Sequence, residues 1–147
     1  MSNPELPPTL LASPSFQLER LRRRTRDEVE AALQDSGLTL RGYWVLACLV
    51  HAKAASQSAL CELLAVDASD MVRLVDTLEH HKWAKRERDP KDRRRQIVAA
   101  TKKGRNAFQR LSTTVSEAED RALDESTSKQ LKHLRKLAAA IIASEEE

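Results

Sequence analysis

The chain has 147 residues, of which 41% are hydrophobic, 32% are charged and only 3% are aromatic. This composition predicts one globular domain with a core of Leu, Val, Ala and Ile that is completed by dimerisation. It excludes a disulfide framework, because Cys48 and Cys61 are the only cysteines. The net charge is +3, yet residues 82–110 hold 12 Lys and Arg against 3 Asp and Glu. Such a local excess favours a surface that binds a polyanion.

The first twelve residues, MSNPELPPTLLA, contain three prolines and Glu5 but no long apolar run. They predict a flexible arm over residues 1–12 rather than a cleaved signal peptide. No stretch of the sequence approaches the roughly 20 apolar residues that cross a membrane. We therefore expect a cytoplasmic protein with no membrane partner.

Capping patterns predict two helices before residue 56. Ser13 followed by Pro14 is typical of a helix start, and this helix is expected to reach about Leu33. Because it is rich in Arg and Glu, we expect it to pack against a partner chain. Thr39 is predicted to cap a second helix over residues 40–51, which is apolar on nearly every side and therefore central.

Two short helices and a hairpin follow. Ser56 and Asp67 are predicted to cap helices over residues 57–64 and 68–80, and the short link between them requires a sharp crossing. This pattern indicates a helix-turn-helix. Residues 83–88 and 95–100 flank the basic segment DPKDRR, which predicts two strands joined by a wing loop.

Two long helices complete the chain. Thr101 is predicted to open a helix that reaches about Leu123, and Ser126 or Ser128 to cap a last helix with an apolar face. The expected fold class is mainly α with a small β-hairpin wing. This is a winged helix-turn-helix region over residues 39–100, with residues 13–38 and 101–147 forming a helical dimerisation region.

Three segments carry a resemblance to a known family: SALCELLAVDASDMVRLVDTLE (58–79), RDPKDRRR (88–95) and TKKGR (101–105). Their types and their order resemble the MarR family of winged helix-turn-helix transcriptional regulators. The resemblance implies an intertwined homodimer whose two winged modules straddle a DNA duplex. It also implies a regulator, often a repressor, that is released by a small molecule or by cysteine oxidation.

Two positions depart from the family pattern. Lys82 stands where a glycine usually follows the recognition helix, and Ala100 stands where a leucine is usual. A residue other than glycine in a left-handed turn costs on the order of 1 kcal/mol. The turn at Lys82 is therefore open to a different conformation. Neither the change at Lys82 nor that at Ala100 removes a DNA-contacting group.

The helix over residues 68–80 is the expected reader of base edges. Arg73 has the geometry to pair with guanine O6 and N7 in the major groove. In the alternative interpretation, Arg73 only pairs with Asp70 or Asp76 on the helix surface. The recognition-helix candidates are Ser69, Asp70, Arg73 and Thr77.

The wing tip is the expected backbone and minor-groove reader, because a narrow groove concentrates negative potential that attracts arginine. Arg94 stands at the wing-tip arginine of the family, and Asp92 is expected to orient an arginine rather than touch DNA. A solvated basic loop is the alternative. The wing candidates are Lys91, Arg93, Arg94 and Arg95.

Backbone contacts are expected from the start of the helix over residues 57–64. Ser56, Gln57 and Ser58 offer hydroxyl, amide and backbone N–H groups that suit a phosphate, and Ser56 is also compatible with a plain N-cap. Arg86, in the first wing strand, is expected to meet either phosphate or a helix of its own module.

Two further pairs of residues have competing interpretations. Tyr43 and Trp44 lie where the resemblance implies a pocket for a small aromatic effector, and a plain interface role explains them equally well. Cys48 and Cys61 are candidates for redox sensing, although their apolar surroundings favour simple packing. No metal site is expected, since the histidines show no ligand spacing; these are His51, His80, His81 and His133.

The sequence as a whole predicts a homodimeric, sequence-specific transcriptional regulator that binds a palindromic operator in double-stranded DNA. A repressor released by a small aromatic effector is the specific expectation. The alternatives are a winged-helix protein-interaction module and a thiol-based redox-sensing regulator. No enzymatic activity and no cofactor are expected, because the sequence has no glycine-rich phosphate loop and no nucleophile–base pair.

Overall fold

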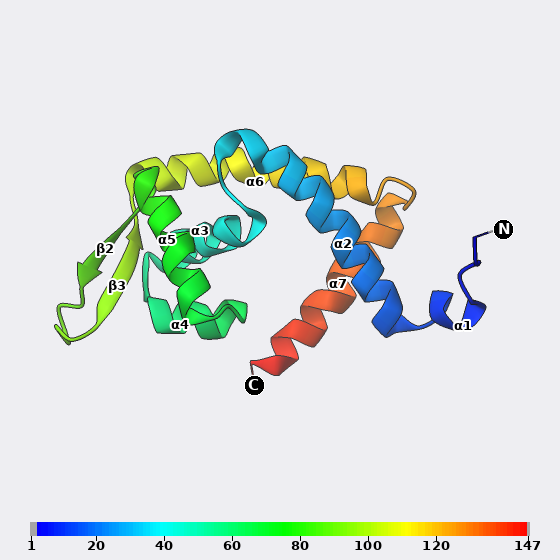
Figure 1. Cartoon of the computed structure of the whole chain (residues 1–147), viewed down its shortest axis with the longest axis horizontal. Coiled ribbons are helices and arrows are strands. Elements are labelled where there is room, and N and C mark those ends of the chain that lie inside the picture. Colours follow the sequence, from blue (N-terminus) through cyan, green and yellow to red (C-terminus); the bar gives the residue numbers. More distant parts are fainter. Residues whose placement is uncertain (1–2, 147) are drawn as a thin grey trace.

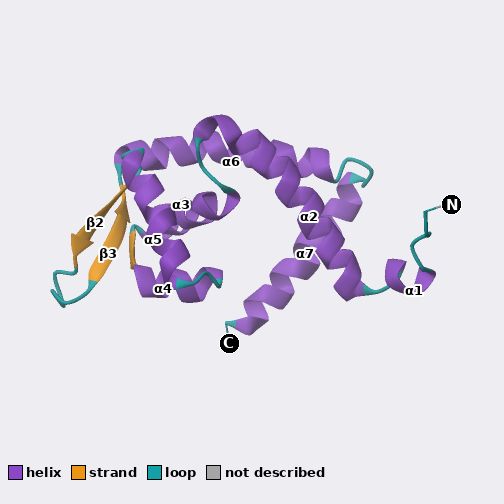
Figure 2. Ribbon diagram, viewed as in Figure 1, coloured by secondary structure: helices purple, strands orange, loops and turns teal. Residues whose placement is uncertain are grey.

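The computed structural model describes residues 3–146; residues 1 and 2 of the expected arm, and Glu147 of the expected dimerisation region, lie outside the described residues. The chain is mainly helical with a small antiparallel sheet and forms a winged helix-turn-helix, as predicted (Figure 2). The elements in chain order are α1 (Pro8–Leu11), α2 (Pro14–Leu33), η1 (Gln34–Ser36), α3 (Leu40–Ala52), β1 (Ala54–Ser56), α4 (Gln57–Leu64), α5 (Ala68–His80), β2 (Ala84–Arg88), β3 (Gln96–Ala100), α6 (Lys102–Ala122) and α7 (Ser128–Glu145).

The winged module and the terminal helices occupy opposite ends of the molecule (Figure 1). Helix α6 runs from the base of the wing to the other end, where the chain reverses into α7. Helix α2 packs against α6. Among the described residues, no helix is both long and apolar enough to cross a membrane.

The hydrophobic core is centred on α3, which contacts α5, α6 and the sheet. Val45, Leu46 and Leu49 of α3 are fully buried. Met71 and Val75 bring the inner face of α5 onto the same core, at the spacing of a buried helical stripe. The outer face of α5 is therefore fixed in its orientation by the burial of the inner one.

The sheet contains one strand that the sequence did not reveal. Strand β1 pairs antiparallel with β3, which lies between β1 and β2. The three residues of β1 are too few for any periodicity, so only the distant partner strand defines them. The short helix α1 lies within the expected arm and has no buried residue.

Most of the predicted helix caps are present. At four helix starts the cap side chain accepts a hydrogen bond from a backbone N–H three residues on; these caps are Thr39, Ser56, Asp67 and Thr101. Ser13 makes no such bond. The predicted cap of α7 is wrong: Thr127, between the two expected serines, forms a capping box with Gln130.

The turn after α5 keeps its left-handed conformation without glycine. Lys82 has a φ of 63°, and its N–H donates to the Glu79 carbonyl over 2.9 Å. The N–H of Trp83 donates to the Leu78 carbonyl over 2.9 Å, which completes a Schellman motif. The departure at Lys82 thus leaves the turn intact, and the cost is strain in one residue.

The base of the wing is joined closely to α6. The Thr101 N–H donates to the Trp83 carbonyl over 3.0 Å, and the Thr101 hydroxyl donates to the Lys82 carbonyl over 2.6 Å. A Cβ on Gly104 would collide with the Trp83 carbonyl. Glycine is therefore required at this position by close approach rather than by its φ angle.

Candidate nucleic-acid interface

Helices α4 and α5 form the helix-turn-helix. Ala65 takes a left-handed conformation with a φ of 53°, which lets the chain reverse within the short link. Asp67 then caps α5 by accepting the Asp70 N–H over 2.8 Å. This hydrogen bond holds the pKa of the Asp67 carboxyl below its ordinary value, since it favours the ionised form. The first turn of α5 is thereby capped directly after the link from α4.

The predicted recognition residues lie on the outward side of α5. The Arg73 side chain is 81% exposed, and its Nη1 lies 4.0 Å from an Asp70 carboxylate oxygen. The Ser69 hydroxyl donates to Asp67 over 3.2 Å, and the Thr77 hydroxyl donates to the Arg73 carbonyl over 3.1 Å. Arg73 is thus the one of the four with a long, exposed charged side chain, although both interpretations of it remain compatible with this geometry.

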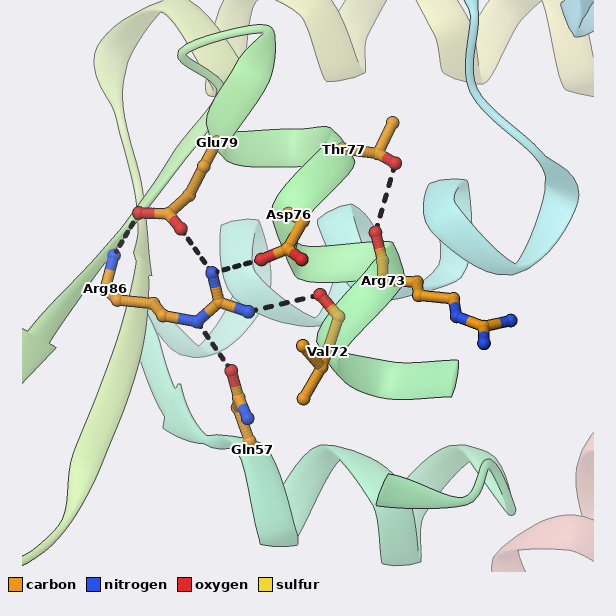
Figure 3. Close-up of polar contacts among 7 residues, drawn as sticks. All are labelled: Gln57, Val72, Arg73, Asp76, Thr77, Glu79 and Arg86. Atoms are coloured by element: carbon orange, nitrogen blue, oxygen red, sulfur yellow. Dashed lines mark hydrogen bonds and ion pairs between the residues drawn. The ribbon is translucent and has the colours of Figure 1, made fainter. Parts of the chain in front are cut away.

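Arg86 of β2 is tied to the recognition helix (Figure 3). Its Nη1 contacts Asp76 at 2.7 Å and also pairs with Glu79. Its Nη2 donates to the Val72 carbonyl over 3.1 Å, and its Nε donates to Gln57 of α4 over 2.8 Å. Only 18% of the side chain is exposed. Of the two predicted partners for Arg86, the structure places it against the helices of its own module.

The Arg86 partners Asp76 and Glu79 were missed as functional residues. They lie three positions apart on α5, so they share one face of the helix. Two carboxylates on one face repel each other unless a cation lies between them. The sequence therefore indicated that a cation lies beside this pair of carboxylates. It did not indicate that the cation is Arg86, which follows them by seven and ten residues on another element.

The wing tip is an ordered turn between β2 and β3. The Asp89 N–H donates to the Arg95 carbonyl over 2.9 Å, and the Arg95 N–H donates to the Asp92 carbonyl over 2.9 Å. Asp92 accepts both the Arg94 N–H at 3.1 Å and the Arg94 Nε at 3.2 Å. The Arg94 side chain is 92% exposed. Asp92 therefore holds the Arg94 Nε and leaves its Nη groups free of partners among the described residues.

The remaining wing candidates lie beside Arg94 and are exposed; they are Lys91, Arg93 and Arg95. The Lys91 N–H donates to Asp89 over 2.9 Å, which orders the backbone of the loop. The side chains that would meet DNA are thus carried on a turn whose shape is set by two aspartates. A basic loop with this internal order is better suited to groove insertion than an unstructured one.

Comparison with known proteins bears on this arrangement. Residues 36–95, which include both helices of the helix-turn-helix, β2 and the wing tip, match the MarR family model. A MarR-family transcriptional regulator from Rhodococcus sp. RHA1 has a similar structure, with 29% identity, a TM-score of 0.79, and coverage of 86% of this chain and 90% of that one. Residues 36–95 of this chain are thus of the MarR family type. Members of this family are transcriptional regulators and not enzymes.

Two further MarR-family structures are informative. CouR from Rhodococcus jostii RHA1, solved with p-coumaroyl-CoA bound, is 29% identical with a TM-score of 0.76, covering 92% of this chain and 95% of that one. A mutant MarR from E. coli in complex with operator DNA has a TM-score of 0.73 at 19% identity, over 86% of this chain and 91% of that one, and shows likeness of fold. No curated protein matches the sequence significantly.

The candidates for backbone contact lie where α4 begins. Ser56 is buried and caps α4 by accepting the Ala59 N–H over 3.1 Å, while its neighbour Ser58 is exposed. The side-chain amide oxygen of Gln57 already accepts a hydrogen bond from the Arg86 Nε. The exposed hydroxyl in this group is thus that of Ser58, with the Gln57 amide nitrogen beside it.

A cavity of about 560 Å³ lies where α2, α3 and α5 meet. It is lined by Arg22, Thr25, Arg26, Glu30, Thr39, Leu40, Arg41, Trp44, Leu64, Asp70, Arg73 and Leu74. Trp44 is 41% exposed and forms part of its wall. The structure thus places Trp44 on the wall of a cavity, and its part in an effector pocket stays a prediction.

Tyr43 does not line that cavity. Its ring stacks on Phe108 of α6 with 5.5 Å between centroids. Burial, and then the charge of Glu119, raise the pKa of the Tyr43 hydroxyl. Adjacent residues on a helix point about 100° apart, so Tyr43 and Trp44 serve different surfaces. The pairing of these two aromatics in one pocket is therefore corrected.

The two cysteines are free and half-buried. Burial raises the pKa of the Cys48 thiol, which lowers its fraction of reactive thiolate. Cys61 faces a groove between α4 and α5 that Val72 and Asp67 also line. In the part of the chain that the structure describes, no cluster of three potential metal ligands occurs.

Proposed function

We propose that this protein is a homodimeric, sequence-specific DNA-binding repressor of the MarR family that a small-molecule effector releases from its operator. The observation that carries the proposal is the exposure of Arg73 on α5 and Arg94 on the wing within one module. Residues 82–110 of that module concentrate the positive charge of the chain. A helix for base edges beside a basic wing suits a duplex, where phosphate contacts provide affinity and base contacts provide specificity.

The roles follow from the exposure of each group. Arg73 reads guanine, with Ser69, Asp70 and Thr77 contributing along the same face of α5. Arg94 enters the minor groove with its neighbours Lys91, Arg93 and Arg95. The Ser58 hydroxyl and the Gln57 amide nitrogen meet phosphate at the start of α4, which the buried Ser56 caps. Arg86 is assigned to positioning in place of direct contact, because each of the three nitrogens of its guanidinium already donates to a group of its own module.

Dimerisation through residues 13–38 and 101–147 is supported by an uncovered apolar face on α7. Within the described chain, α7 has no buried residue. Its exposed apolar side chains are Leu134, Leu137, Ile141 and Ile142. Covering such side chains stabilises an association by roughly 25 cal/mol for each Å² of apolar surface removed from water. A second copy supplies a matching face through two-fold symmetry, which also accounts for a palindromic operator.

Release by a small aromatic effector is supported by the cavity beside Trp44 and by the ligand that CouR carries in its solved structure. Redox release through Cys48 or Cys61 is the alternative. Mass spectrometry after mild peroxide treatment separates the two, since an effector-released repressor keeps both thiols unmodified at unchanged operator affinity.

The test is footprinting on the DNA upstream of the gene, followed by titration of a labelled operator. We expect protection of a palindrome. Arg94→Ala should weaken binding to all sequences and lower the slope of log K against log[salt] by about one. Arg73→Ala should relax preference at one symmetric position per half-site, by about 1–3 kcal/mol. Arg20→Ala, which removes one charge from α2, is the control.

Equal affinity of the wild type and Arg94→Ala would contradict the wing assignment. No protected site at any salt concentration would contradict DNA binding as a whole. That second outcome would favour the protein-interaction module, which keeps the winged fold and recognises a partner protein.

A further inference from the structure

The outward side of α5 carries an exposed apolar side chain beside Arg73. Val72 is 41% exposed, whereas Met71, Val75 and Leu78 of the same helix are fully buried. Figure 3 shows that Val72 and Arg73 leave α5 in different directions, with Val72 on the side of Gln57. The buried stripe of α5 is complete without Val72, so packing of the core does not require a valine at this position.

Val72 lines a groove between α4 and α5, which we call the α4–α5 groove. Ala68, one helical turn before Val72, lies on the same wall, and Cys61 belongs to the wall formed by α4. Two acidic residues, Glu62 and Asp67, also line the groove. Because carboxylates repel a phosphate, this groove suits an uncharged apolar group better than the DNA backbone.

The position of Val72 is fixed by its backbone and by the shape of its side chain. Its carbonyl accepts a hydrogen bond from the Arg86 Nη2 over 3.1 Å, and the Nε of the same guanidinium donates to Gln57 of α4 over 2.8 Å. A valine in a helix adopts one rotamer in about nine cases out of ten. The two methyl groups of Val72 are therefore held in place relative to α4, and a contact with them costs little side-chain entropy.

The 5-methyl group of thymine is the apolar group that base pairs present in the major groove. Ser69 and Arg73, the exposed recognition residues on either side of Val72, offer only polar groups to base edges. Residues near the start of a recognition helix are the ones that reach those edges, and Val72 opens the second turn of α5. Val72 thus has the chemistry and the place to contact a thymine.

We propose that Val72 is a specificity-determining residue whose methyl groups pack against the 5-methyl group of one thymine in each half-site of the operator. This inference rests on the proposed function and adds a base preference to it. Since Val72 and Arg73 are adjacent on α5, the thymine lies within about two base pairs of the position that Arg73 reads. Contact removes both apolar surfaces from water, which is the source of the preference.

The experiment uses the full-length protein and an operator selected from a pool of random duplexes. Each thymine of the selected operator is replaced by uracil, first in one half-site and then in both. Uracil lacks only the 5-methyl group and keeps the pairing with adenine, so the replacement deletes one contact and leaves the protein unchanged. Affinity is measured by titration of the labelled duplex at one fixed salt concentration.

For the wild type we expect one thymine position at which uracil weakens binding by about fourfold in one half-site and by about fifteenfold in both, the effect of burying one methyl group at each. In Val72→Ala the replacement in both half-sites should change affinity by less than about twofold. Binding of this variant to the thymine operator should fall by about fifteenfold.

Leu63→Ala is the matched control. It removes a side chain of α4 that is 63% exposed and that lines a different groove. This variant should keep the wild-type affinity and the wild-type effect of uracil. A thermal unfolding scan checks that both variants are folded, and the uracil scan of the wild type does not depend on any variant.

Two results would overturn the inference. One is a scan in which no uracil position weakens the wild type by more than about twofold. The other is a Val72→Ala variant that keeps the full effect of uracil, which would make Val72 a packing residue. A selected operator with either result contradicts the role of Val72 alone. Recovery of no duplex from the pool contradicts the proposed function, and the role of Val72 with it.

Discussion

Replacing Arg86 by alanine should destabilise the winged module. The change removes the cation that pairs with both Asp76 and Glu79, and it removes the side-chain donor to the Val72 carbonyl. Removing one partner of a buried charge pair costs about 3–5 kcal/mol. Glu79 is 35% exposed and Asp76 is 59% exposed, so water replaces part of what is lost. We therefore expect the free energy of unfolding to fall by about 2–3 kcal/mol, at or below the lower limit of that range.

The measurement is urea unfolding at one fixed protein concentration, because the stability of a dimer depends on concentration. Asp76→Asn is the matched control: it removes the most exposed partner and should cost less than about 1 kcal/mol. Arg86→Lys should recover only part of the loss, because an ammonium keeps the charge without the planar fork that reaches four partners.

Operator titration decides between positioning and direct contact at Arg86. A positioning residue changes affinity without changing the number of phosphates neutralised, so the slope of log K against log[salt] should stay at the wild-type value. A phosphate contact would lower that slope by about 0.9. A lower slope in Arg86→Ala would refute the positioning role, and a loss of stability below about 1 kcal/mol would refute the structural importance of its hydrogen bonds.

Three further outcomes are expected. Lys82→Gly should raise the free energy of unfolding by about 0.5–1 kcal/mol in urea, because glycine accepts the left-handed φ of 63° without strain; an unchanged or lower value would show that the turn is unstrained. Gly104→Ala should lower it by about 1–3 kcal/mol, since the added methyl group meets the Trp83 carbonyl; wild-type stability would mean that α6 shifts without cost. Asp67 stabilises the fold above its unfolded pKa of about 3.9, and this contribution is lost as the pH falls through its lowered folded pKa. Urea midpoints followed from pH 6 to pH 2 should therefore fall less steeply for Asp67→Asn than for the wild type, and parallel curves would contradict the assignment.

What could be predicted from the sequence was mostly local. The caps at Thr39, Ser56 and Asp67 depend on a side chain and an N–H three residues away, and all three were predicted correctly. The buried apolar positions of α5 repeat with the helical period, and the residues on its exposed face could therefore be predicted as well. The contact of Asp92 with Arg94 spans only two residues and was also expected.

What could not be predicted depends on contacts across the fold. Strand β1 exists because β3 lies beside it, more than forty residues later in the chain. The partners of Arg86 come from α4 and α5, and its choice between helix and phosphate needed coordinates. The separation of Tyr43 from Trp44, in contrast, was available from helical geometry alone, because neighbouring residues do not share a face.

The close joint between Trp83 and α6 has a mechanical consequence for a dimer. Two hydrogen bonds from Thr101 and the close contact of Gly104 join the base of the wing rigidly to the first turn of α6. The wing and α6 then move as one rigid body, which rotates about the end of α6 that adjoins α7. A small tilt there is magnified along the length of the helix into a larger displacement at Arg94. Adjustment to operators of different half-site spacing is thus expected at the junction of α6 and α7 and not within the wing.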